Sequence, residues 1–279
     1  MLSIVLGILA AAFYGAADFC GGIATKRTSI FAVTIVSQAA GLALLAIVVV
    51  FTPGRALPFD YLWGALGGIC GGVGIALLYH ALSIGKMGVV SPITAVLAAA
   101  TPAVFGVVVR HEPLAWFQIA GILVALVAVV LISLSHEEDG RLEFSTAGVK
   151  EAIAAGLIIG GFFLFLGTAS PGAGLQPLLI ARVASVLFLL LIAAIARSSF
   201  VPRDGTLGLV VFAGGIDMTA NVLFVLADHA GLLSVASVLT SLYPASTVLL
   251  ARVVLKERLA LIQKLGVGLA LAGVALIAY

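Results

Sequence analysis

Three ionisable side chains stand within long apolar stretches of this sequence, and their types suit them to bind a small solute. Asp18, Arg182 and Asp217 each lie among apolar and small residues. An ionisable group inside an apolar span costs several kcal/mol, so it usually faces a cavity or a partner. A carboxylate can bind an ammonium group, and a guanidinium can bind a carboxylate. The three side chains therefore predict a buried site for a zwitterion.

The same residues also fit structural ion pairs. Arg182 could pair with Asp217, because their depths differ by about one helical turn of ~5.4 Å. Asp18 could pair with Lys26 or Lys86 near the end of its apolar run. A single buried aspartate could also bind a coupling proton, although no second acid lies in the same turn. These interpretations stay open on the sequence.

Polar and aromatic residues near the charged ones extend the candidate site. Tyr79 and His80 close one apolar run, and Asn221 and Phe224 occupy the equivalent part of another. Aromatic rings would suit an apolar or aromatic side chain of a ligand, while packing and anchoring at a membrane boundary is the alternative. The predicted substrate-binding residues are Tyr79, His80, Arg182, Asp217, Asn221 and Phe224.

Prolines inside apolar runs indicate where helices could bend. Pro92 and Pro102 share one run and Pro244 lies in another. Proline frees a carbonyl and kinks a helix, either as a moving hinge or as a static bend. The residues expected to form the pathway or its gates are Asp18, Tyr14, Gln38, Pro92, Tyr243 and Pro244.

The elements that must position these residues are membrane spans. Apolar residues make up 63% of the 279 residues and charged residues 9%, against roughly 25% charged residues in a soluble domain. The apolar runs are about twenty residues long, enough to cross a hydrocarbon core of ~30 Å. We expect an all-α integral membrane protein with ten transmembrane helices. Their expected bounds are Leu2–Ala24, Ile30–Phe51, Tyr61–Leu82, Met87–Val109, Leu114–Leu134, Ala147–Thr168, Gln176–Ala196, Thr206–Ala227, Leu232–Val254 and Ala260–Ala278.

Several function classes are disfavoured by the composition. A net charge of +2 is too small to indicate nucleic-acid binding. A membrane-embedded enzyme would need clustered carboxylates with a metal, or a nucleophile with a base, whereas the acids here are scattered. Cys20 and Cys70 lie in apolar runs and fit small core residues. We therefore expect no enzyme activity, no cofactor and no metal site. Separately, the apolar run that begins at Leu2 is expected to be a first span rather than a cleaved signal peptide.

The cations are distributed unequally between alternate connectors. Arg55 and Arg110 lie on one side. The connectors of the other side carry or adjoin Lys26, Arg27, Lys86, Arg141, Lys150, Arg197, Arg203, Arg252, Lys256, Arg258 and Lys264. Because cytoplasmic connectors are enriched in Lys and Arg, the larger set predicts the cytoplasmic side. With an even number of spans, both termini are then expected on the outer side of a cell inner (plasma) membrane.

The two halves of the chain are similar at an offset of 145 residues. Residues Glu112, Leu114, Ala115, Gln118, Gly121, Ala125, Leu126, Val129, Leu131 and Ile132 are identical to their counterparts from Glu257 to Ile277. Each half has five expected spans, an odd number, so the second half would enter the membrane with the opposite orientation. Such inverted repeats recur in secondary transporters, with the substrate site near mid-membrane at the repeat interface. The expected units are 1–134, a polar connector 135–146, and 147–279.

Short motifs at the ends of both halves resemble a known family. The second half contains Ser241-Leu242-Tyr243-Pro244, then Leu255-Lys256-Glu257-Arg258-Leu259, Gln263 and Gly266. The first half has a weaker copy in His111-Glu112-Pro113-Leu114, Gln118 and Gly121, with Ala99 where the second half has Pro244. The sequence resembles EamA repeats of the drug/metabolite transporter superfamily, and within it the YddG-type amino-acid exporters.

This resemblance implies an exporter of small metabolites with ten helices and a central cavity at the repeat interface, working by alternating access. Amino acids, with aromatic or hydrophobic ones favoured, are the expected substrates; a multidrug or nucleotide-sugar-like carrier is the alternative, and a membrane-embedded enzyme is less favoured. The expected partners are a small-molecule substrate and the lipid bilayer, in a monomer or weak oligomer.

Overall fold

A computed structural model describes residues 1–52, 54–85, 87–133, 147–202, 205–255 and 261–278. Within these ranges all regular structure is helical. The helices are α1 (Leu2–Thr25), α2 (Ile30–Phe51), α3 (Pro58–Ile84), α4 (Met87–Val108), α5 (Trp116–Ser133), α6 (Val149–Thr168), the short 3-10 helix η1 (Pro171–Ala173), α7 (Gln176–Ile195), α8 (Leu207–His229), α9 (Leu233–Thr240), α10 (Tyr243–Leu255) and α11 (Leu261–Ala278).

Six of these helices are long and apolar enough to cross a bilayer. They are α1, α2, α3, α6, α7 and α8, and shorter apolar helices lie within α4, α5 and α11. Backbone polar groups in lipid must bond within their own segment, which makes helices the natural form of such runs. The expectation of an all-α, multi-pass membrane protein is confirmed.

Local chemistry moves some helix ends away from the expected bounds. The third span was expected to begin at Tyr61, but α3 begins at Pro58. Proline suits the first turn because its missing N–H would be unpaired there anyway. The Leu57 N–H donates to Asp60 Oδ2 at 2.7 Å, which closes the start of the helix.

The run expected as one span from Leu232 to Val254 forms two helices, α9 and α10. Pro244 follows the break, and it has no N–H with which to bond the carbonyl of Thr240. By contrast, α4 continues without a break through both of its prolines. Ala99 is the repeat counterpart of Pro244, and it keeps its N–H.

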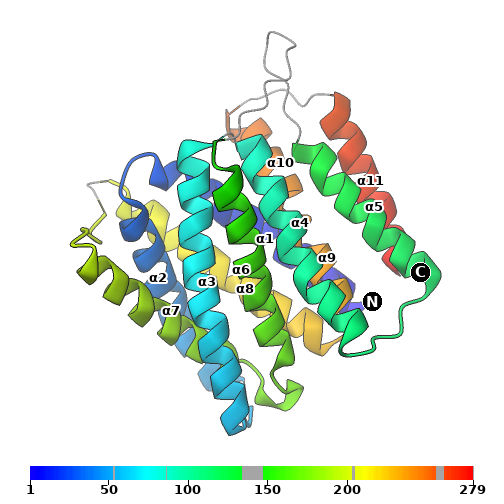
Figure 1. The fold of residues 1–279 in the computed structure, drawn as a ribbon, viewed down its shortest axis with the longest axis horizontal. Helices are drawn as coiled ribbons and strands as arrows, with labels where there is room; N and C mark the ends of the chain where they lie inside the picture. The colour runs from blue at the N-terminus through cyan, green and yellow to red at the C-terminus, as the bar shows by residue number, and fades with distance from the viewer. Residues whose placement is uncertain (53, 86, 134–146, 203–204, 256–260, 279) are drawn as a thin grey trace.

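Helix packing follows a repeated pattern. α3 packs on α6 and α7, while α8 packs on α1 and α2, and α5 pairs with α11. In Figure 1 α3, α6 and α4 run side by side, with α5 and α11 at one edge of the bundle. A side chain at Gly68 of α3 would collide with the backbone of Ala181 in α7, and one at Gly214 of α8 with that of Ser37 in α2. These glycines allow the close contacts on which the central region depends.

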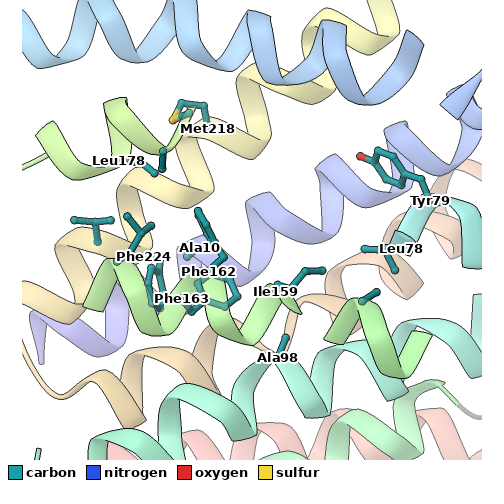
Figure 2. Packing of buried hydrophobic residues seen from close by; sticks show 14 of the residues in the cluster. Ala10, Leu78, Tyr79, Ala98, Ile159, Phe162, Phe163, Leu178, Met218 and Phe224 are labelled. Atoms are coloured by element: carbon teal, nitrogen blue, oxygen red, sulfur yellow. The ribbon is translucent and has the colours of Figure 1, made fainter. Parts of the chain in front are cut away.

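The largest buried cluster draws its residues from α1 to α4 and from α6 to α9. Figure 2 shows Phe162 and Phe163 of α6 beside Phe224 of α8, with Leu178 and Met218 nearby. Phe224 is fully buried. This cluster forms one wall of the candidate site.

Candidate functional site

A narrow cavity of about 40 Å³ lies at the centre of the bundle, enough for water and too little for a metabolite. Residues from α1, α2, α3, α6, α7 and α8 line it. Its polar lining consists of Tyr14, Gln38, Arg182, Ser185, Asp217 and Asn221. Five of these six were predicted from the sequence to bind substrate or form the pathway, and helices far apart in the chain bring them together.

Arg182 lies at the centre of this polar group. It projects from the second turn of α7, and its side chain is 6% exposed. Its Nη2 donates to Asp217 Oδ2 at 2.5 Å, and its Nη1 donates to Gln38 Oε1. The ion pair between Arg182 and Asp217, which the sequence allowed as one interpretation, is therefore present. Both terminal nitrogens of the guanidinium have partners, while the buried Nε has none in the described structure.

Asn221 extends the network by one turn of α8. Its Nδ2 donates to the Asp217 backbone carbonyl at 2.7 Å and lies 3.2 Å from Asp217 Oδ2. Its Oδ1 is buried and has no partner among the described residues. The amide therefore holds Asp217 in place and leaves one acceptor free.

Two hydroxyl groups at the cavity are also buried without a hydrogen-bond partner among the described residues. They are the Tyr14 hydroxyl and Ser185 Oγ. A buried polar group without a partner costs free energy comparable to a lost hydrogen bond. The sequence analysis did not predict Ser185 as a site residue. Its position one turn after Arg182, on the same face of α7, was the available signal.

Aromatic side chains close one side of the cavity. Phe162 and Phe163 line it. The Phe163 ring lies 6.0 Å from the Tyr14 ring and 4.5 Å from the Phe224 ring, measured between centroids. Phe224 packs behind Phe163, outside the cavity lining. The sequence analysis did not predict either of the α6 phenylalanines. The available signal was the repeat offset of 145, which makes Phe163 the counterpart of Asp18, a residue expected in the pathway.

Comparison with known proteins identifies the family. The profile of the EamA-like transporter family matches residues 1–134 and 146–279. The chain belongs to the EamA-like transporter family. The protein is thus a multi-pass membrane transporter of the drug/metabolite superfamily, and the family consists of transporters rather than enzymes.

Two individual proteins resemble this EamA chain. An uncharacterized protein of Methanocaldococcus jannaschii is 29% identical over 140 residues, which is 48% of this chain and 98% of that protein. A solved crystal structure of a protein superposes with a TM-score of 0.74 at 18% identity, covering 99% of this chain and 98% of the other. At that identity the likeness concerns the fold.

Other predicted residues of this EamA protein lie away from the cavity lining. Tyr79 is buried in the core, with its hydroxyl packed against Gly21 of α1. His80 is exposed near the end of α3. Asp18 is half-buried one turn beyond Tyr14. No ion pair joins Asp18 to Lys26 in the described structure, and Lys86, its other suggested partner, lies outside the described residues.

The proline break lies behind the cavity. The start of α10 packs so closely on α1 that a side chain at Gly15 would collide with the Tyr243 carbonyl. Thr247 Oγ1 also donates to the Gly15 carbonyl at 3.1 Å. Tyr243 is half-buried and Pro244 is buried. The side chain of Pro92 lies outside the described part of the structure.

Proposed function

We propose that this protein exports small metabolites by alternating access, with amino acids as substrates and aromatic or hydrophobic ones favoured. The observation that carries the proposal is the buried Arg182–Asp217 ion pair, bordered by four buried polar atoms that have no hydrogen-bond partner among the described residues. Native proteins rarely leave such atoms unpaired. Four of them around one cavity indicate a place for a polar ligand.

The chemistry of the free atoms suits both charged groups of an amino acid. Arg182 Nε and the hydroxyl groups of Tyr14 and Ser185 are donors that suit a carboxylate. Asn221 Oδ1 is an acceptor that suits an ammonium group, with the carboxylate of Asp217 beside it. The rings of Phe162 and Phe163 would contact an apolar or aromatic side chain.

The small volume of the cavity supports a moving carrier. Because a metabolite does not fit the space of about 40 Å³, the surrounding helices must part to admit one. A permanently open channel would require a wider path.

The proposed architecture is ten spans in two inverted halves, 1–134 and 147–279, joined by the connector 135–146. Two observations support it. The pairing of α3 with α6 and α7 has a counterpart in the pairing of α8 with α1 and α2, which is related to it by the repeat. The helices α9 and α10 together correspond to the single helix α4. We further propose an inner-membrane location with both termini outside, and a monomer or weak oligomer.

Transport by purified protein in liposomes tests the proposal. Vesicles loaded with labelled phenylalanine, leucine or alanine should release the label faster than protein-free vesicles, with phenylalanine and leucine fastest. The double variant Arg182→Gln with Asp217→Asn removes the ion pair without leaving a buried charge. It should fold and lose most of this transport.

Movement of another metabolite but no amino acid would contradict the substrate class. Full activity in the double variant would show that the ion pair serves only to hold the helices together. Gly172→Ala is a suitable control, because the added methyl group would meet no atom of the described structure within 4 Å.

A further inference from the structure

A second group of charged residues lies beyond the cavity, where α8 ends and α9 begins. Glu112, in the connector between α4 and α5, bonds the start of α9. Its Oε1 accepts the Leu233 N–H at 3.0 Å. Its Oε2 accepts the Ser234 N–H at 3.1 Å and the Ser234 hydroxyl at 2.6 Å. A carboxylate at this position satisfies helix N–H groups that would otherwise be unpaired and complements the helix dipole.

Arg110 joins this cap to two helix ends. Its Nη1 lies 3.5 Å from Asp228 Oδ1 and 3.8 Å from Glu112 Oε1, and it donates to the Gly167 carbonyl at 3.3 Å. Asp228 lies in the last turn of α8 and Gly167 in that of α6, where the helix dipole is negative and favours a cation. The two carboxylate side chains are 6% exposed and Arg110 is 36% exposed.

An aromatic layer separates this charged group from the cavity. On α8 the order is Asn221 at the cavity, then Phe224, then Asp228, each three or four residues apart. On α6, Phe163 at the cavity precedes Gly167 by four residues. The Phe163 and Phe224 rings are 4.5 Å apart. Phe163 therefore borders the cavity and lies about 6 Å along α6, one turn, from Gly167. Phe224 lies about one turn from Asn221 on one side and one turn from Asp228 on the other.

The bonds made by this group cross between the two halves of the chain. Arg110 and Glu112 belong to the first half. Apart from the contact between the two, the partners that the structure gives their side chains belong to the second half. Any movement that separates the halves here must break them. Water can replace the bonds of Arg110, because that side chain is already partly exposed.

We propose that Arg110, Glu112 and Asp228 form an ionic latch that closes this end of the transport pathway and must open before the Phe163–Phe224 pair can part. This inference rests on the proposed alternating-access function, although not on the identity of the substrate.

Accessibility of the cavity from each side of the membrane tests the latch. Ser185→Cys places a thiol at the cavity, in a chain whose Cys20 and Cys70 are replaced by alanine. A membrane-impermeant maleimide is applied to vesicles of both orientations. Glu112→Gln should raise the labelling rate about tenfold from one side only, because an amide loses the charge and cannot accept all three bonds.

Two further variants test the size and the specificity of the effect on the labelling rate. Ser234→Ala removes one hydroxyl donor and keeps the backbone cap, so it should give a smaller increase from the same side. Asp60→Asn is the matched control. Asp60 also links the halves, through Ser170 N–H at 2.8 Å, but where α3 and α7 pack tightly through glycines and away from the ring pair. Its labelling rate should stay at the parent value.

Equal labelling rates in Glu112→Gln and the parent, with the melting temperature unchanged, would overturn the latch and leave Glu112 as a static helix cap. A rise from both sides together with a lower melting temperature would also overturn it, since loosening of the whole fold would explain the result. One-sided labelling without transport of any amino acid would support the latch while contradicting the proposed substrate. The latch and the proposed substrate can therefore be contradicted independently of each other.

Discussion

At the scale of single residues, Arg182 organises the centre of the protein. Its guanidinium contacts Gln38 of α2 and Asp217 of α8 from a position on α7. Removing a charge from water is expensive, and the ion pair and hydrogen bonds compensate for it only when both partners are present. One buried residue thus ties three helices together and borders the space that we assign to substrate.

This dependence predicts different stabilities for single and double variants. Arg182→Gln leaves Asp217 as an uncompensated, largely buried charge and should lower the free energy of unfolding by about 3–5 kcal/mol. Adding Asp217→Asn should recover most of that loss, because the second change removes the charge. Denaturation in detergent, followed by circular dichroism, measures both. Equal losses in the single and double variants would contradict this account of the ion pair.

At the scale of elements, the two halves differ at the break between α9 and α10. Pro244 lies at the break, while its repeat counterpart Ala99 lies within the continuous helix α4. The start of α10 packs against Gly15, next to Tyr14 of the cavity lining. A change in the angle at the break would therefore move groups that contact the cavity wall.

Pro244→Ala tests whether the break moves. The new N–H can bond the Thr240 carbonyl, which would favour one continuous helix. We expect at least a severalfold slower initial transport rate in liposomes with unchanged helix content. Pro102→Ala in α4 is the control and should change the rate less, since α4 is already continuous there. An unchanged rate in folded Pro244→Ala would show that the bend is static.

At the scale of the whole molecule, the distribution of cations predicts how the bundle sits in the membrane. Arg55 and Arg110 are the cations expected outside, so the proposed latch would lie at the outer end. A reporter that is active only in the cytoplasm, fused after Tyr279, should be inactive. Activity of that fusion would reverse the orientation. The one-sided labelling caused by Glu112→Gln would then be expected from the cytoplasmic side.

The sequence by itself determined the class of this protein. Runs of about twenty apolar residues must form helices in lipid, because no water is there to bond the backbone. The repeat at an offset of 145 and the motifs around Glu112 and Glu257 led to the EamA family before any helix was placed. Rare polar residues in apolar runs also predicted most of the polar cavity lining, because such residues are costly unless they have partners.

Only the tertiary structure decided which of those residues meet. Helices that are apolar on all sides carry little periodic signal, so the face that each turns inward follows from close packing with its neighbours. Packing brought Ser185 and Phe163 to the cavity and placed His80 on the exposed surface. It also determined that Glu112 bonds the start of α9, more than a hundred residues away, because the helix ends meet only in the assembled bundle.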